Sequence, residues 1–403
     1  MKSRRKIIID RFLEIVFFGG IFILPLVWWP WAAVRYEIPR VFFFNRWVEL
    51  LFLLSIISGL FKKPKNLNVG LLLLFNIFIV IALISSLLGV DFTKSLFGNH
   101  LRGDGLITLI HLVGFSVFIA FNWKNLFIER LVKIIGIGIF LLSSWTIFTA
   151  LRFYLFHDQS VNMWGNGSFG VSFGNPKFLA GYLLVTLPFT SYLIRQSKNL
   201  GERYFGIICL VLQIIAIGLT KSWAGFLGVV IFAAGWVILS NFRFKHLVFG
   251  VSIIVMLFLA FIYIQNYRNL GFVPEGRERI IRRSLMGFTK RPVLGWGWAN
   301  TDYAMEDSPW PIVFGHDVYV DKAHGMILEV LVTTGVVGLT IYLALLGKMG
   351  VVLVRKIRGD GGYKGTLFLV FILYIFHSQT NIISIGEEIF FWLIAGIVAS
   401  NEV

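Results

Sequence analysis

Long blocks of mostly apolar residues recur from one end of the chain to the other, and they limit the fold more than any other feature. A helix needs about 20 such residues to cross the hydrocarbon core of a bilayer, and the blocks are roughly of that size. Charged residues make up 14% of the 403-residue chain, whereas a soluble domain has roughly 25%. The pattern predicts an all-α polytopic membrane protein whose polar residues lie in connecting loops.

The apolar blocks predict twelve transmembrane helices. The first follows a basic start and ends in three tryptophans, which suits an uncleaved helix with an interfacial aromatic belt better than a signal peptide. The tenth is long, and we expect a break at residues 333–335 because threonine and glycine weaken a helix interior. The twelve helices are expected at residues 12–33, 41–61, 68–89, 105–121, 132–156, 174–194, 204–220, 223–240, 247–265, 324–354, 364–378 and 386–400.

The positive residues predict the orientation. Of the 37 lysines and arginines, 21 fall in the termini and short loops on one side of the predicted helices. By the positive-inside rule that side is cytoplasmic, and both termini lie there. A net charge of +16 would suggest nucleic acid binding in a soluble protein. In a membrane protein, the distribution of the positive residues between the two sides instead indicates the orientation. We therefore expect a multi-pass protein of the cytoplasmic membrane with membrane lipids, and no nucleic acid, as partners.

The longest predicted loop covers residues 266–323 on the outer side. It separates nine transmembrane helices in residues 1–265 from three in residues 324–403. A loop longer than about 15 residues is usually functional or disordered. This loop contains Trp296, Trp298 and Trp310 among periodic apolar positions, so we expect it to fold on the membrane surface.

The segment "GRERIIRRSLMGFTKR", residues 276–291, has apolar residues near helical spacing and arginines between them. It is typical of an amphipathic helix with a basic face, which includes Arg277 and Arg279. Guanidinium groups bind phosphate oxygens in pairs. The alternative is that each arginine reaches toward lipid phosphate at the interface. Because other cations also lie on the outer side, we favour a shared diphosphate ligand, which a lipid carrier would supply.

Three further outer cations are candidate substrate ligands. Arg102 lies in "SLFGNHLRGDGL", where the alternative is a turn in which Asp104 pairs with Arg102 or caps the next helix. Lys177 follows an Asn-Pro pair at the start of a predicted helix, where an anion is stabilised, although simple capping is equally possible. Lys221 lies in a tight turn between two predicted helices.

The stretch "VDKAHGMILEVLVTTGVVGL", residues 320–339, places a histidine and a glutamate at the mouth of an apolar helix. An imidazole accepts a proton near neutral pH, so His324 is a candidate general base, the alternative being an ordinary interfacial histidine. Glu329 could orient His324 or pair with an arginine, but a spacing of five does not stack the two on one helix face. Because ionisable residues are costly inside a membrane helix, their presence there indicates a functional role, which we expect for Glu329.

Neither a metal ion nor another cofactor is predicted. Cys209 is the single cysteine, so neither a disulfide within the chain nor a Cys/His metal site can form. The acidic residues of the outer loop form no tight carboxylate pair in sequence that would favour a metal ion.

Together these segments resemble the O-antigen ligase and polymerase superfamily of bacterial membrane glycosyltransferases. "FGNPKFLAGYL" is similar to the family's Gly-Asn-Pro signature, and "GRERII" followed by "KRPVLGWGWANT" to its Gly-Arg motif and Pro-x-x-Gly-x-Gly run. "HGMILEVLVTTGVVGL" resembles its His, Leu-Glu and Gly-x-x-Gly-Leu signature, and "LFGNHLRGDGL" an early outer loop. The resemblance covers essentially the whole chain and implies a GT-C-like fold with a large outer loop before helix 10.

The resemblance implies transfer of a glycan from an undecaprenyl diphosphate carrier to an acceptor hydroxyl at the outer face of the membrane, without metal. Arg277 matches the arginine expected at the diphosphate, and His324 the base that deprotonates the acceptor. The family usually has Ser-Arg where this chain has Ser222-Trp223, so Lys221 or Arg279 is expected to replace the missing arginine. The acceptor is expected to be a glycan or a lipid-linked molecule. The alternatives are a polymerase of lipid-linked repeat units, a transporter of a small anion or solute, and a lipid-binding scaffold.

Overall fold

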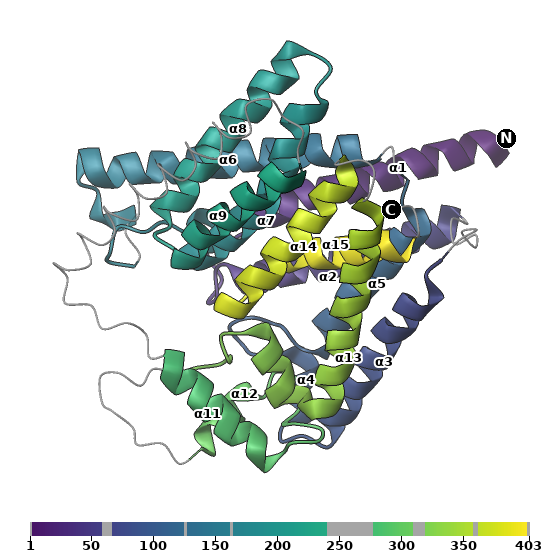
Figure 1. Cartoon of the computed structure of the whole chain (residues 1–403), viewed down its shortest axis with the longest axis vertical. Coiled ribbons are helices and arrows are strands. Elements are labelled where there is room, and N and C mark those ends of the chain that lie inside the picture. The colour runs from purple at the N-terminus through teal and green to yellow at the C-terminus, as the bar shows by residue number, and fades with distance from the viewer. Residues whose placement is uncertain are drawn as a thin grey trace.

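The computed structural model describes residues 2–58, 67–124, 127–161, 164–239, 277–308, 319–357 and 362–400. Within these residues the regular secondary structure is entirely helical (Figure 1). The long helices are α1 (Lys2–Ile23), α2 (Glu37–Ser58), α3 (Val69–Leu87), α5 (Leu106–Asn122), α6 (Phe127–Phe156), α7 (Pro176–Gln196), α8 (Leu200–Leu219), α9 (Trp223–Leu239), α11 (Arg277–Lys290), α13 (Met326–Ile357), α14 (Tyr363–Thr380) and α15 (Ile385–Ala399). The short ones are η1 (Leu24–Leu26), α4 (Phe92–Phe97), η2 (Gln159–Val161), η3 (Val171–Phe173) and α12 (Thr301–Glu306).

Helices lie at eleven of the twelve predicted positions, and the ninth, residues 247–265, lies outside the described residues. Six described helices are long and apolar enough to cross a membrane, namely α2, α3, α6, α7, α8 and α13. Two shorter apolar helices, α5 and α9, accompany them. The fold is therefore that of an all-α membrane protein, while the count of twelve spans stays a prediction.

The first helix differs from its predicted bounds. Helix α1 begins at Lys2 and ends at Ile23, so the predicted residues 24–33 lie beyond it. Pro25 lies at the start of η1, where its ring disfavours helical backbone in the preceding residue and removes a donor. Trp31, one of the three tryptophans that follow, is 87% exposed in an irregular segment.

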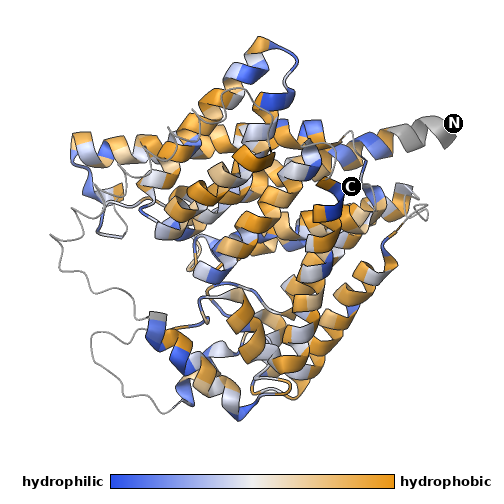
Figure 2. Ribbon diagram, in the orientation of Figure 1, coloured by the Kyte–Doolittle hydropathy of each residue, from blue (hydrophilic) through white to orange (hydrophobic). Residues whose placement is uncertain are grey.

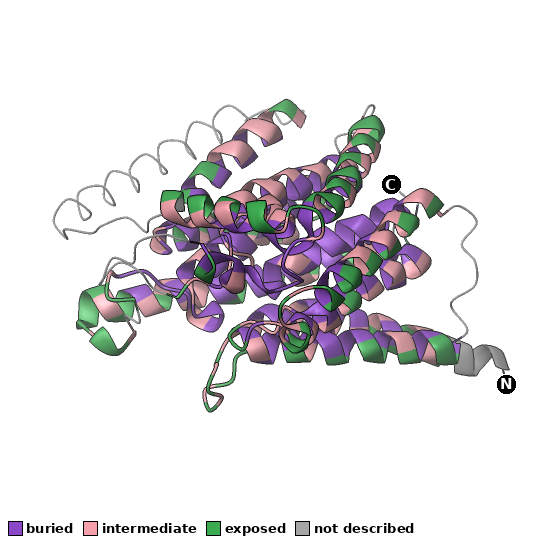
Figure 3. Ribbon diagram, turned by 90° about the horizontal axis from the view of Figure 1, so that it is seen from below, coloured by how far each residue is buried: buried purple, intermediate pink, exposed green. Residues whose placement is uncertain are grey.

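Helices α7 and α15 form the centre of the bundle. Helix α15 packs against α5, α14 and α7, while α7 also contacts α6, α8 and α9. Every residue of α15 except Glu388 is buried, and the buried residues fill the middle of the molecule in Figure 3. The helices at the periphery instead expose large apolar side chains such as Ile56 and Ile238. Hydrophobic residues therefore also colour the peripheral helices in Figure 2. Such a surface suits contact with lipid rather than with water.

Helix α13 is broken at Gly335, as predicted. The backbone of Gly335 has φ 65° and ψ −168°, a conformation that residues with a side chain rarely adopt. The break frees backbone groups of α13, and the turn residues 292–297 form hydrogen bonds with them. Trp296 N donates to Val332 O (3.0 Å), Gly297 N donates to Thr333 O (2.9 Å), and Val336 N donates to Pro292 O (2.9 Å). The segment after α11 is therefore joined to the middle of α13.

Replacing Gly335 with alanine is expected to destabilise the protein by about 1–3 kcal/mol or more. A Cβ atom there would lie 2.1 Å from Val293 O, and the backbone conformation would itself be strained. Thermal unfolding in detergent measures the effect. Gly347→Ala, in the same helix but with no atom within 4 Å of the added Cβ, is the control and should be neutral or slightly stabilising. Equal melting temperatures for the two variants would contradict the role of the break.

Candidate functional site

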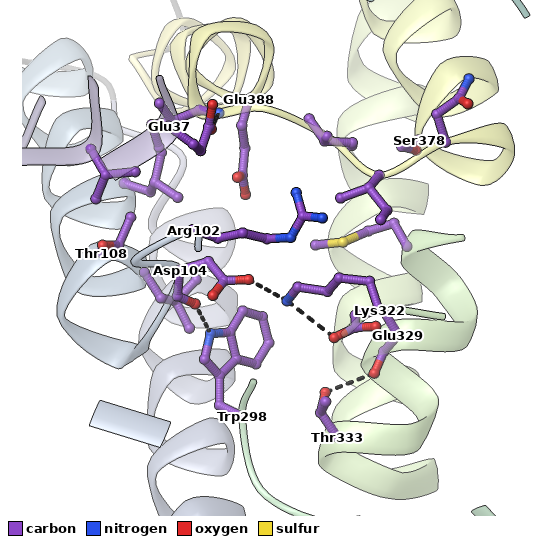
Figure 4. Close-up of a pocket in the computed structure, with 18 of the residues that line it drawn as sticks. Glu37, Arg102, Asp104, Thr108, Trp298, Lys322, Glu329, Thr333, Ser378 and Glu388 are labelled. Carbon is purple, nitrogen blue, oxygen red and sulfur yellow. Dashed lines mark hydrogen bonds and ion pairs between the residues drawn. The ribbon is translucent and has the colours of Figure 1, made fainter. Parts of the chain in front are cut away.

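A cavity opens where the start of α13 faces the start of α5 and the turn between α14 and α15 (Figure 4). Its wall combines segments from five parts of the chain: the start of α2, residues 102–112, Trp298, residues 322–333 and residues 378–388. Three of the predicted site residues, Arg102, His324 and Glu329, line this one cavity. The ionisable residues of the wall are Glu37, Arg102, Asp104, Lys322, His324, Glu329 and Glu388.

Arg102 extends across the cavity from the loop before α5 (Figure 4). Its guanidinium group donates through both Nε and Nη2 to the Asp321 carboxylate, with Nη2 3.2 Å from Oδ1. Its Cζ lies 5.5 Å from the ring centre of Phe178 at the start of α7. Burial lowers the pKa of Arg102, but the hydrogen bonds and charge of Asp321 outweigh burial and raise it. The suggested pairing with Asp104 is wrong, since the partner is Asp321, near the end of the loop predicted at residues 266–323.

Lys322 joins two carboxylates at the cavity wall. Its ammonium group forms ion pairs with Asp104 and, at 3.1 Å, with Glu329 (Figure 4). Burial raises the pKa of Asp104, but the charge and hydrogen bond of Lys322 outweigh burial and hold that pKa below its usual value. Burial likewise lowers the pKa of Lys322, but Asp104 and Glu329 raise it well above the ordinary value. Asp104 and Lys322 therefore stay charged around neutral pH.

Asp104 does not cap the following helix either. The N-cap of α5 is Gly105, which makes no side-chain capping bond. Besides Lys322, Asp104 accepts a hydrogen bond from Asn99 N (3.1 Å), and its carbonyl accepts one from Trp298 Nε1 (2.8 Å). These bonds fix the loop that carries Arg102 against Trp298 and Lys322.

Glu329 holds the turn that carries His324. Its carboxylate accepts hydrogen bonds from the Thr301 hydroxyl (2.7 Å) and from the backbone N of Ala323 (2.8 Å), next to the histidine. The suggested arginine partner is wrong, because its charged partner is Lys322. His324 itself has φ 57°, in the left-handed region where histidine and asparagine are tolerated better than most residues. Such backbone strain clusters at functional sites.

The opposite wall is fixed by buried polar groups that the sequence patterns did not single out. Glu37 forms an ion pair with the fully buried Arg40 (2.9 Å) and accepts a hydrogen bond from Ile385 N (2.6 Å). Arg40 also donates to three carbonyl oxygens: Leu24 O, Val27 O and Ser172 O. These contacts tie α2 to the start of α15, so the buried arginine has a structural role here.

A second fully buried pair supports the turn between α14 and α15. His377 Nδ1 lies 2.9 Å from Glu387 Oε1, and both side chains are completely buried. Asn381, which lines the cavity, lies 3.2 Å from the other ring nitrogen of His377. Gly181 of α7 allows this close approach, because a Cβ there would lie 2.1 Å from Glu387 Oε2. The pair thus positions Asn381 at the cavity wall.

The other predicted cations lie outside the wall of this cavity. Lys177 is at the first turn of α7, which begins at Pro176 and is capped by the Asn175 side chain (Oδ1 to Lys177 N, 2.9 Å). Lys221 donates to the carbonyl of Asn166, and burial lowers its pKa. Arg279 lies on α11, which is the predicted helix with a basic face. The side chain of Arg277 lies outside the described residues.

Helix α11 packs against α12 and α13. Since the first turns of α13 line the cavity, α11 is in contact with a helix of the cavity wall. Its small residues Ser284 and Gly287 are buried, whereas Ile281 and Leu285 are 45% and 43% exposed. Arg283 Nη2 donates to Met305 O (2.6 Å), which fastens the helix to α12. The exposed apolar residues Ile281 and Leu285 beside the exposed Arg282 suit a helix lying at a membrane surface.

The sequence profile of the O-antigen ligase family matches residues 208–343, about a third of the chain. This match supports membership of the O-antigen ligase and polymerase superfamily. The matched region runs from α8 into α13 and includes α11, His324 and Glu329. The family suggests glycan transfer, and the apolar helices indicate a membrane protein. A search of curated proteins finds no match to the chain.

Within the described ranges, no group of three or more His, Cys, Asp or Glu side chains is arranged to hold a metal ion. Three of the four carboxylates of the cavity, Glu37, Asp104 and Glu329, are instead bound to cations and to hydroxyl or amide donors of the protein. The chemistry available in the cavity is therefore that of a histidine, a set of carboxylates and two cations.

Proposed function

We propose that the protein transfers a glycan from an undecaprenyl diphosphate carrier to an acceptor hydroxyl at the outer face of the cytoplasmic membrane. The observation that carries the proposal is the cavity in which His324, Arg102 and Glu329 meet, within a chain of the O-antigen ligase superfamily. In the proposed topology both termini are cytoplasmic. Residues 1–265 and 324–403 contribute nine and three membrane helices, and residues 266–323 lie outside.

The acceptor oxygen attacks the anomeric carbon of the carrier-linked sugar. The bond from that carbon to the diphosphate oxygen breaks, and the diphosphate leaves with the electron pair. A single displacement of this kind inverts the anomeric centre and needs no metal. His324 takes the proton of the acceptor hydroxyl, which requires a base within hydrogen-bond reach. Glu329 acts through the turn that it anchors, because its oxygens already accept bonds from Thr301, Lys322 and Ala323.

The leaving diphosphate gathers negative charge, which fixed guanidinium groups stabilise. Arg277 and Arg279 on α11 are the proposed ligands, with Lys177 and Lys221 as further candidates on the outer side. Arg102 contributes from within the cavity, where Asp321 holds its guanidinium in place. Because four carboxylates and only two permanently charged cations line the cavity, we place the diphosphate toward α11 rather than deep inside.

Transfer in membranes tests this function. Membranes from a strain with its own glycan genes are supplied with wild type, His324→Ala or Arg277→Ala at matched protein levels. Glycan on the carrier lipid is then compared with glycan on the acceptor. Both variants are expected to leave the carrier loaded and the acceptor bare.

The lengths of the products separate two reactions of the same superfamily. Whole chains on a new acceptor indicate a ligase, whereas a ladder of longer carrier-linked chains indicates a polymerase. Wild-type behaviour of both variants would overturn the site and favour the transport or scaffold alternative.

A further inference from the structure

Glu388 projects into the cavity from the first turn of α15 (Figure 4). It is the one residue of that helix that is not fully buried, and it faces the space above Arg102 in the figure. Its carboxylate lies 3.5 Å from Trp392 Nε1, the long limit of a hydrogen bond. Among the described residues, no cation forms an ion pair with it.

The other three carboxylates of the cavity wall are held by the protein. Glu37 is paired with Arg40, Asp104 with Lys322, and Glu329 with Lys322 and two further donors. A carboxylate withdrawn from water without a partner is costly, and it is retained in a membrane helix where function requires it. Glu388 therefore has its hydrogen-bonding capacity directed at the contents of the cavity.

The charges of the cavity define the class of ligand. Four carboxylates against two permanent cations disfavour a second anion beside Glu388. Hydroxyl groups, in contrast, donate hydrogen bonds to a carboxylate and accept one from a protonated carboxyl group, so they suit Glu388 in either form. The ring of Trp298 lines the same cavity and offers an apolar face with its N–H bound elsewhere, to Asp104 O. In Figure 4 Glu388 and Trp298 lie at opposite ends of the cavity wall, with Arg102 between them. A cavity that offers a carboxyl group and an aromatic face suits a sugar, which has hydroxyl edges and apolar C–H faces.

We propose that Glu388 is a binding residue for a sugar hydroxyl of the acceptor, which it holds in the cavity that His324 shares. The inference rests on the proposed function and deepens it by naming a neutral, hydroxyl-rich sugar as the occupant of the acceptor side. The diphosphate of the donor stays toward α11, on the basic side. The two substrates are thus sorted by charge.

Binding of free sugars tests the proposal without turnover. The probes are the methyl glycosides of glucose, galactose and N-acetylglucosamine, added to the detergent-solubilised full chain and followed by saturation-transfer NMR. At least one probe is expected to bind wild type. Glu388→Gln, which keeps the shape but removes the charge, is expected to weaken that binding at least about tenfold, the loss of one hydrogen bond to a charged group.

Three further variants keep the result interpretable. Glu202→Gln, on the far end of α8, should bind as wild type does. Trp392→Phe removes the N–H near Glu388, and it should leave sugar binding unchanged if the carboxylate acts directly. Glu388→Asp repeats the test with the charge retained on a shorter side chain if the glutamine variant fails to fold, and partial loss of binding is expected.

The proposal is overturned if no probe binds wild type, if Glu388→Gln binds equally well, or if Trp392→Phe reproduces its defect. In the last case Glu388 serves only to hold Trp392. Because binding is measured without transfer, failure of the sugar site leaves the proposed function standing. Conversely, if His324→Ala transfers glycan as wild type does while the sugar probes still bind at Glu388, the sugar site stands and the proposed reaction does not.

Discussion

His324→Asn is expected to lower the rate of glycan transfer about 10²–10⁴-fold, the range that a positioned general base contributes. Asparagine tolerates the left-handed backbone that His324 adopts and still forms hydrogen bonds, but it cannot take a proton. The variant therefore separates the chemistry from the strain that alanine would add at φ 57°. The rate is measured as labelled glycan moved from carrier lipid to acceptor in membranes with equal amounts of protein.

His100→Asn is the matched control for this experiment. His100 is exposed in the loop before α5, outside the cavity wall, and its replacement should leave the rate unchanged. A His324→Asn enzyme that keeps more than about a tenth of the wild-type rate would exclude His324 as the base. The acceptor proton would then pass to another group.

Lys322→Met is expected to destabilise the protein by about 3–5 kcal/mol, the usual cost of removing one partner from a buried ion pair. The Lys322 side chain is 14% exposed and separates the carboxylates of Asp104 and Glu329, which would face each other unpaired in the variant. The apparent melting temperature in detergent should fall by at least about 5 °C. Transfer should fall as well, because Glu329 anchors the turn that carries His324.

The pH dependence of this loss has a definite sign. The pKa of Asp104 is lowered on folding, so its contribution is complete above about pH 4 and is lost as the pH falls through the folded value. The pKa of Lys322 is raised, so its contribution is complete below about pH 10 and is lost only as the pH rises through the folded value. The stabilisation that Asp104 and Lys322 give the wild type should therefore be constant between about pH 5 and 9.

Lys133→Met provides the control, since it breaks an ion pair of the same type with Glu202 at 2.8 Å, where the two side chains are 49% and 35% exposed. Exposed pairs contribute about 0–1 kcal/mol, so this variant should melt close to wild type. Similar melting temperatures for the two variants would show that the Asp104–Lys322–Glu329 cluster adds nothing beyond a surface pair.

The positions of the helices could be predicted because the length of an apolar block is a local property of the sequence. Helix α13 even shows its predicted break, since glycine is the residue that adopts the backbone found at Gly335. The first helix was placed less well, because Pro25 ends it while the apolar composition continues. Hydropathy measures the preference of a segment for lipid, and it does not register where backbone geometry stops a helix.

The candidate site was predictable only in part. His324, Arg102 and Glu329 carry local signals, namely ionisable groups at the ends of apolar blocks, and the structure places all three in one cavity. Their partners were not predictable from local sequence. Arg102 and Asp321, for example, are 219 positions apart, and no pattern around either residue indicates that the two pair. Glu388 was missed for a different reason. An acidic residue in the first turn of a helix is common, since it favours the helix dipole, so the sequence alone gives it no distinction.

The join between residues 292–297 and the break in α13 has a mechanical consequence. The backbone bonds from Trp296 and Gly297 to Val332 and Thr333 clamp the chain just after α11 onto the helix that begins beside His324. Helix α11 and the first turns of α13 are therefore linked by main-chain hydrogen bonds. If the proposed carrier binds α11, we expect a displacement of that helix to reach the mouth of the cavity through these bonds.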